Sequence, residues 1–174
     1  FGGKITKKVK IHHEENGGIS RYDKIPLYLE WAGEKVSSDE VTKYSDEFSK
    51  LVKQEVVQSK WVPGILSFLQ KQSESKIFFI VTATPQEEIE ELVNTLELKR
   101  YFEEIIGTPT TKKDAIKEIL EKYEIATQNA IMVGDSITDY NAATINNIKF
   151  LLRKTNLNKK IQKQLQCQKI IDFN

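Results

Sequence analysis

The fold class is decided by residues 76–93, KIFFIVTATPQEEIEELV. The run 76–82 is short and almost wholly apolar, which is typical of a strand buried on both faces of a parallel sheet. Thr84, Pro85 and Glu87 then fit a capping box with proline in the first helical turn. Apolar residues recur at helical spacing after them. The stretch therefore predicts a strand followed at once by a helix.

The same alternation continues to the end of the chain. Short apolar runs predict further strands, and helical patterns separate them; the strands are expected at 104–106, 130–133, 149–152 and 169–173. Strand–helix repetition with short connections is typical of a parallel sheet with helices on both faces. We therefore expect a three-layer, Rossmann-like α/β core.

Residues 1–60 differ, because their pattern is helical throughout. Gly17 and Gly18 are expected to end a first helix, and Pro26 suits the first turn of a second helix that ends at Gly33. Ser38 suits the N-cap of a third helix with an apolar face. We expect two parts, an α-helical insert in residues 1–60 and an α/β core in residues 61–174.

Composition narrows the class of protein. The chain has 174 residues, of which 39% are hydrophobic and 29% charged, as in a folded soluble protein. A net charge of +1 argues against a dedicated nucleic-acid surface. No apolar run is long enough to cross a membrane, so no membrane partner is expected. Cys167 is the single cysteine, and a reducing, cytoplasmic location is the simplest interpretation. The oligomeric state is left open.

In open parallel sheets, ligands bind at the carboxyl ends of the strands. At one such end, the Thr82 hydroxyl and the backbone N–H groups from Ala83 onward could bind a phosphate at a helix N-terminus. Taken alone, plain helix capping by Thr84 explains this segment better.

Two further strand ends carry charged residues. Lys112 lies in the first turn of a predicted helix, where a cation opposes the helix dipole and suggests an anionic partner, although a solvated surface lysine is the simpler interpretation. Asp135 and Asp139 place one carboxylate at a strand end and another in the next helical turn, which suits a hard cation. A capping box formed by Ser136 and Asp139 is the alternative.

Together and in this order, these segments resemble motifs two, three and four of the haloacid dehalogenase superfamily. The three segments are VTATP at 81–85, GTPTTK at 107–112 and VGDSITD at 133–139. Residues 13–21, HEENGGISR, also resemble the start of the cap in phosphoglycolate-phosphatase-like members. The resemblance covers essentially the whole chain.

The resemblance implies a Mg²⁺-dependent phosphatase that acts on a small phosphorylated metabolite through a phosphoaspartate intermediate. Thr82 matches the hydroxyl that binds the transferring phosphoryl group, with Ala83 beside it. Lys112, rather than Lys113, matches the lysine that holds nucleophile and phosphate together.

Asp135 and Asp139 match the acidic positions that hold or support Mg²⁺ in the superfamily. Residues 1–60 match an α-helical cap that closes over the substrate, and Arg21 is a candidate substrate-binding residue in it. A surface arginine is an equally good interpretation of Arg21.

One motif of the superfamily is missing from these residues. The first motif, Asp-x-Asp, carries the nucleophile and ends a central strand, and it is nowhere in the sequence. We therefore expect the first core strand to be absent from this chain, between the strands that end near Thr82 and Val133. Residues 1–174 alone are then expected to be inactive and to expose apolar strand edges.

Three alternatives stay open. The chain could be a catalytically inactive relative that only binds a ligand, or a phosphoglucomutase-type phosphotransferase. A response-regulator-like or flavodoxin-like module is a third, and the helical insert and the order of Thr82, Lys112 and Asp135 count against it.

Overall fold

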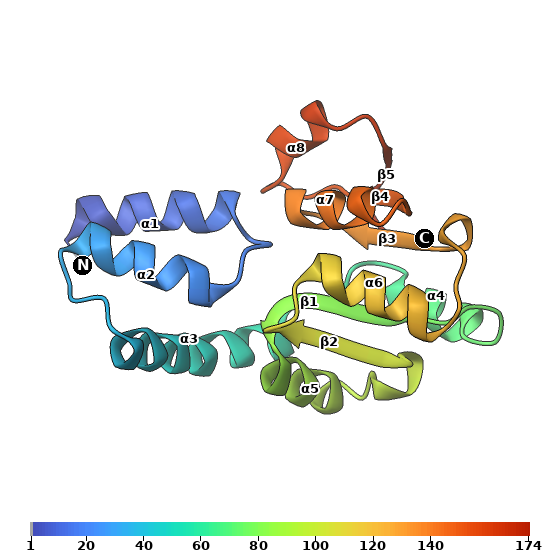
Figure 1. Cartoon of the computed structure of the whole chain (residues 1–174), viewed down its shortest axis with the longest axis horizontal. Coiled ribbons are helices and arrows are strands. Elements are labelled where there is room, and N and C mark those ends of the chain that lie inside the picture. The colour runs from blue at the N-terminus through green and yellow to red at the C-terminus, as the bar shows by residue number, and fades with distance from the viewer. Residues whose placement is uncertain (1) are drawn as a thin grey trace.

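Helices alone make up the first third of the chain. The computed structural model describes residues 2–174. Within them, α1 (Gly3–Glu15), α2 (Arg21–Ala32) and α3 (Ser38–Gln58) come first, and α4 (Ile65–Gln72) leads into the strands. Figure 1 shows α1, α2 and α3 lying together at one end of the molecule. The expectation that the residues before 60 are helical is confirmed.

Strands and helices alternate in the remainder, which confirms the α/β class. The elements are β1 (Phe79–Pro85), α5 (Gln86–Thr95), β2 (Glu104–Thr108), α6 (Lys112–Lys122), β3 (Ile131–Gly134), α7 (Ile137–Ile145), β4 (Lys149–Arg153), α8 (Lys159–Gln164) and β5 (Gln168–Ile170). All the pairings between these strands are parallel, as expected for strands joined by helical crossovers.

The strands form two sheets rather than one. β1 pairs with β2, and β3, β4 and β5 pair in that order. Within the described residues 2–174, no hydrogen-bonded ladder joins β1 to β3, so each has one unpaired edge. On one face of β3, the apolar side chains of Ile131 and Val133 are exposed by 51% and 39%.

The junction between β1 and α5 differs from its prediction. The strand begins at Phe79 and continues through Pro85, so the predicted capping box at Thr84 is wrong, and α5 has no side-chain cap. The side chain of Gln86 explains the difference, because its Oε1 accepts a hydrogen bond from the N–H of Gly107 at 2.6 Å. Its Nε2 donates to the carbonyl of Ile105 at 2.9 Å. These bonds hold the chain alongside β2 beyond Thr84.

The start of α2 also differs from its prediction. The helix begins at Arg21, and Pro26 lies inside it rather than in its first turn. Ser20 is the N-cap, and its hydroxyl accepts from the N–H of Tyr22 at 3.3 Å. The earlier start places Arg21 and Lys24 on the buried face of the helix. The N-cap of α3 is Ser37, one residue before the predicted Ser38.

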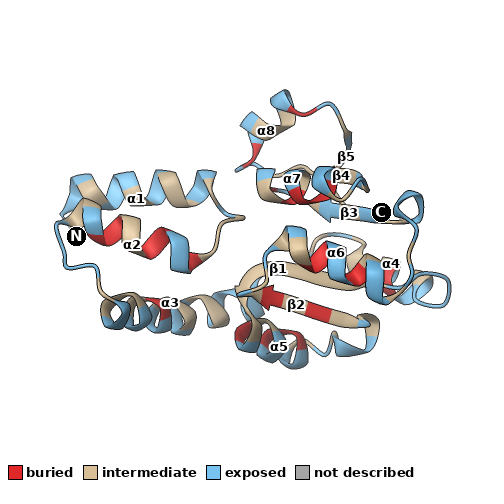
Figure 2. Ribbon diagram, viewed as in Figure 1, coloured by how far each residue is buried: buried red, intermediate tan, exposed pale blue. Residues whose placement is uncertain are grey.

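The core lies mainly between the strands and their covering helices. Figure 2 shows buried residues concentrated on β2, α5, α6 and α7, with a second group on α2. Leu29 and Leu152 are the large side chains with almost no exposure in the described chain. By contrast, α1 buries no residue, and Leu51 on the apolar face of α3 is 72% exposed. The strand-bearing part is therefore better packed than the helices before it.

Candidate active site

The ends of β2 and β3 point toward the loop between α1 and α2. Figure 1 shows both arrows directed to that side of the molecule. Lys112 begins α6 shortly after β2, and residues 135–139 connect β3 to α7. Parallel strands thus bring residues that are far apart in sequence to the same edge.

Lys112 and Asp139 form a direct ion pair at this edge. The Lys112 Nζ lies 2.5 Å from Asp139 Oδ1, and their side chains are 13% and 7% exposed. The same ammonium donates to Thr138 Oγ1 at 3.4 Å. A charge-assisted hydrogen bond of this length is among the stronger contacts in a protein. Lys113 pairs instead with Asp114 on the exposed surface.

The second oxygen of Asp139 holds the start of α7. Asp139 Oδ2 accepts from the N–H groups of Asp135 at 3.2 Å and Ser136 at 3.0 Å, and from Ser136 Oγ at 2.7 Å. Ser136 and Asp139 thus form the capping box that was the alternative interpretation. Gly134 leaves room for this carboxylate, since a Cβ there would lie 2.5 Å from its atoms. Both oxygens of Asp139 are therefore engaged.

Asp135 is partly exposed to solvent at the strand end, whereas Asp139 is buried. Loss of hydration at the strand end raises the pKa of Asp135, and the charge of Asp139 raises it further, while Arg153 and Lys112 act in the opposite direction. The backbone here is held by Asn158, whose Nδ2 donates to the carbonyls of Asp135 and Arg153, both at 2.8 Å.

Thr82 and Ala83 lie at the end of β1. Thr82 Oγ1 donates to Thr84 Oγ1 at 3.1 Å and accepts from the N–H of Thr84 at 3.2 Å. The carbonyl of Ala83 accepts from Thr108 Oγ1 at 3.0 Å, which joins the ends of β1 and β2. No hydrogen bond links Thr82 to Lys112 in residues 2–174. The structure thus brings Lys112, Asp135 and Asp139 together and leaves Thr82 and Ala83 on the neighbouring strand end.

The loop between α1 and α2 touches the same site. Thr138 Oγ1 donates to the carbonyl of Gly18 at 3.1 Å, across 120 residues of sequence. A Cβ on Gly18 would collide with the hydroxyls of Thr138 and Ser136. The sequence-based predictions missed Ser136 and Thr138 as contacts of this loop. Their position between Asp135 and Asp139 is the one signal that could have indicated them.

Arg21 is buried in a contact between helices. Its guanidinium forms a two-pronged pair with Glu88 in the first turn of α5, at 2.9 Å and 2.7 Å. Arg21 also donates to Ser49 on α3, and Ser49 Oγ donates to Glu88 Oε2 at 2.5 Å. The ring of Phe48 lies 4.7 Å from the guanidinium carbon. Sequence spacing contained no signal for Ser49 or Glu88 as partners of Arg21.

The sequence pattern of haloacid dehalogenase-like hydrolases matches residues 9–152. The chain belongs to this family. No curated protein matches the chain significantly.

Solved structures of other haloacid dehalogenase-like proteins have the same fold. A predicted phosphoglycolate phosphatase from Haemophilus somnus superposes with a TM-score of 0.74 at 17% identity, over 98% of this chain and 84% of the other. CbbY from Rhodobacter sphaeroides, in complex with xylulose 1,5-bisphosphate, superposes with a TM-score of 0.77 at 12% identity, over 93% of this chain and 77% of the other. The HAD-hydrolase YfnB from Bacillus subtilis, bound to magnesium, superposes with a TM-score of 0.69 at 13% identity, over 99% of this chain and 80% of the other.

The described residues supply few ligands for a metal ion. Within residues 2–174, no group of three or more His, Cys, Asp or Glu side chains is placed to hold one. Mg²⁺ is commonly bound by one or two carboxylates together with water and substrate phosphate, so such a group is not required. The available donors are the carboxylate of Asp135 and, beside it, the carboxylate of Asp139, whose oxygens are already hydrogen-bonded. These one or two carboxylates fit Mg²⁺ when water and phosphate supply the other ligands.

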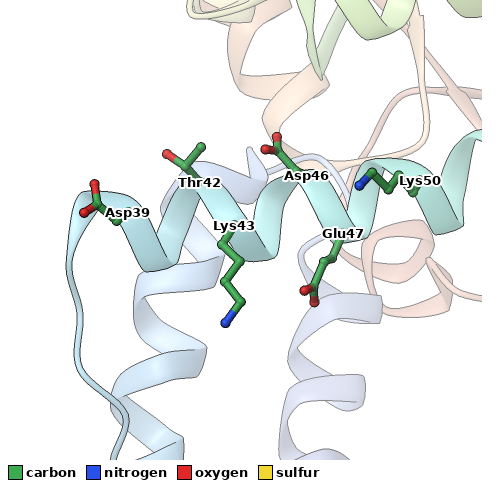
Figure 3. Close-up of a pocket in the computed structure, with 6 residues that line it drawn as sticks. All are labelled: Asp39, Thr42, Lys43, Asp46, Glu47 and Lys50. Carbon is green, nitrogen blue, oxygen red and sulfur yellow. The ribbon is translucent and has the colours of Figure 1, made fainter.

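A surface hollow along α3 is separate from this site. Figure 3 shows that it is lined by side chains of this one helix, namely Asp39, Thr42, Lys43, Asp46, Glu47 and Lys50. A hollow lined by one solvated helix offers no convergent groups for chemistry. None of the helices in the described part of the chain is both long and apolar enough to span a bilayer.

Proposed function

We propose that this haloacid dehalogenase-like hydrolase is a Mg²⁺-dependent phosphatase of a small phosphorylated metabolite, acting through a phosphoaspartate. The observation that carries the proposal is the Lys112–Asp139 ion pair at the strand ends, with Asp135 beside it. A lysine, a free carboxylate and helix N-termini that converge on one edge suit the transfer of an anionic phosphoryl group.

In this proposal, Lys112 binds the phosphoryl oxygens and offsets the charge that develops in the transition state. Asp139 orients the Lys112 ammonium and keeps α7 in place. The Thr82 hydroxyl and the Ala83 N–H donate to the phosphoryl group from the end of β1. Asp135, supported by Asp139, would hold Mg²⁺, and the ion would supply neutralisation of the phosphate charge.

The nucleophile of the proposed reaction is an aspartate on a strand between β1 and β3. β1 and β3 each have one edge without a strand partner within residues 2–174, which supports that placement. The aspartate oxygen bonds to phosphorus as the bond to the ester oxygen breaks, and the leaving oxygen takes a proton from solvent. A water molecule then attacks phosphorus and breaks its bond to the aspartate oxygen, which restores the carboxylate, releases phosphate and returns a proton to solvent. This strand is not supplied by residues 1–174 in our proposal.

Helices α1, α2 and α3 act as a cap in this proposal. The contact between Gly18 and Thr138 supports it, because the α1–α2 loop meets the edge that bears Lys112 at this hydrogen bond. A cap of this kind excludes water from the transferring phosphoryl group.

The function is tested by phosphate release from p-nitrophenyl phosphate with the full-length protein. We expect release that requires Mg²⁺ and stops with a chelator. Lys112→Met should lower kcat/KM by about 100-fold or more, as is typical when a preorganised transition-state donor is lost. Lys113→Met is the matched control and should change kcat/KM by less than about twofold, because the Lys113 side chain faces solvent. Equal effects of the two variants, or no Mg²⁺-dependent release, would refute the proposal.

A further inference from the structure

Arg153 ends β4 with a guanidinium that no carboxylate of residues 2–174 neutralises. None of the ion pairs of the described chain includes Arg153. Its Nε is buried and makes no hydrogen bond. An arginine that serves only the fold usually has its donors satisfied, because a buried donor without an acceptor costs free energy. The position of Arg153 therefore requires a physical explanation.

The register of the sheet places Arg153 beside Asp135. Strands β3 and β4 are parallel, and Gly134 lies opposite Leu152. The next residues along the two chains are Asp135 and Arg153. Because side chains alternate between the two faces of a strand, both belong to the face opposite that of Gly134 and Leu152. A carboxylate and a guanidinium thus lie on neighbouring strand ends and on the same face of the sheet.

A single side-chain amide holds these two strand ends together. Asn158 is 6% exposed, and its Nδ2 donates to the carbonyls of both Asp135 and Arg153 at 2.8 Å. Its Oδ1 accepts from the N–H of Thr155 at 2.9 Å, which fixes the amide in turn. Because one nitrogen binds both carbonyls, Arg153 cannot move away from Asp135 without the loss of a buried hydrogen bond.

The charges at this edge of the sheet are paired, except for those of Asp135 and Arg153. Lys112 and Asp139 neutralise each other. Asp135 is in no ion pair of residues 2–174. Burial and then the charge of Asp139 raise the pKa of Asp135, whereas Arg153 and then Lys112 lower it. The charge of Arg153 therefore acts on the Asp135 carboxylate, although the two groups form no direct ion pair.

We propose that Arg153 is the counter-ion of Asp135 in the metal-free protein and that its charge limits the affinity of this carboxylate for Mg²⁺. The inference rests on the proposed function, in which Asp135 would hold Mg²⁺. Two cations beside one carboxylate repel each other, so the guanidinium opposes an ion bound there. Arg153 acts through Asp135 and not on the phosphoryl group, and it is therefore a positioning residue.

Calorimetric titration of the full-length protein with Mg²⁺ at physiological salt tests the inference. Arg153→Met removes the charge and keeps a long side chain, and Kd should fall by about threefold or more, which means tighter binding. Arg153→Lys keeps a cation and should stay within about twofold of wild type.

Lys149→Met is the matched control, because it removes the same charge from an exposed position at the other end of β4. Lys149 lies about 13 Å from Arg153 along the strand, which exceeds the screening length of physiological salt, so Kd for Mg²⁺ should not change. An equal fall of Kd in Lys149→Met and Arg153→Met would reduce the effect to net charge and overturn the inference.

A purely structural role of Arg153 predicts a change of opposite sign. If Arg153 only supported the strand end, its loss would disorder Asp135, and Mg²⁺ would bind less tightly or equally. Either result in Arg153→Met would overturn the inference. Thermal unfolding gives a second readout, since Mg²⁺ at one fixed concentration should raise the Tm of the variant by more than that of wild type. If Arg153→Met does not fold, Arg153→Gln decides by the same measurements.

The inference and the function fail separately. If the wild-type protein binds Mg²⁺ but releases no phosphate from p-nitrophenyl phosphate, the proposed function fails, and tighter binding in Arg153→Met still supports the inference. If phosphate release requires Mg²⁺ and the substitution does not lower Kd, the function stands and the inference falls. A wild-type protein that binds no Mg²⁺ overturns the inference.

Discussion

At the scale of single residues, the space at Gly18 controls how the α1–α2 loop meets the candidate active site. Gly18 lies against Thr138 and Ser136, and a Cβ at this position would overlap their hydroxyl groups. Gly17, its neighbour, has no atoms within 4 Å of such a Cβ. The two adjacent glycines therefore form a natural matched pair for mutation.

We expect Gly18→Ala to separate the loop from Thr138. The added methyl must displace either the loop or the hydroxyls of Thr138 and Ser136, and such overpacking typically lowers the free energy of unfolding by about 1–3 kcal/mol. The proposed phosphatase activity should fall at the same time, because Thr138, which contacts this loop, also accepts a hydrogen bond from the Lys112 ammonium. Gly17→Ala should leave both properties close to wild type. Denaturant unfolding and kcat/KM measure the effects, and equal behaviour of the two variants would contradict this account.

At the scale of elements, α2, α3 and α5 are joined by one buried polar cluster. Arg21, Ser49 and Glu88 each come from a different helix and are hydrogen-bonded to one another. The cluster fixes the first helices against the strand-bearing part of the chain. Arg21 therefore has a clear packing partner, and its predicted role in substrate binding stays a prediction. Lys53 and Glu91 join α3 and α5 again, at the surface.

Removing the carboxylate charge from each pair should lower the free energy of unfolding much more for the buried pair than for the exposed pair. Glu88→Gln leaves the Arg21 guanidinium buried without a counter-ion, which typically costs about 3–5 kcal/mol. Glu91→Gln breaks the exposed pair with Lys53 and should cost no more than about 1 kcal/mol. Chemical denaturation of both variants measures the free energies of unfolding. Similar values for the two would show that Arg21 and Glu88 are not a buried pair in solution.

At the scale of the whole molecule, the division into two sheets is the main structural feature. The unpaired edges of β1 and β3 belong to different sheets, and Val133 on β3 exposes an apolar side chain. Unpaired apolar edges tend to pair with other chains. The proposed nucleophile strand between β1 and β3 would remove both edges at once.

Residues 1–174 expressed alone should therefore self-associate as concentration rises. Val133→Lys should reduce the association, because a charge on an edge strand opposes pairing. Leu157→Lys is the control, since Leu157 is exposed outside any strand and should have little effect. Light scattering after size exclusion measures the mass. A monodisperse monomer of the unsubstituted residues at high concentration would contradict the expected edge exposure.

Much of this architecture follows from local sequence patterns. Apolar runs and caps located every strand of the core, and the strand-end rule selected Lys112, Asp135 and Asp139, which the structure brings together. The errors arose where a long-range contact overrides a local preference. Thr84 fits a helix cap, but the bonds of Gln86 to β2 extend the strand past it. Pro26 suits a helix start, but α2 begins at Arg21.

The sequence by itself determined the α/β class, the order of elements and the candidate residues at the strand ends, because periodicity and capping are local properties. Only the tertiary structure decided that Arg21 pairs with Glu88, that Gly18 meets Thr138 and that Lys24 pairs with no carboxylate of residues 2–174. These contacts join residues far apart in the chain or depend on burial. Each is set by how folded elements pack together, which no local pattern encodes.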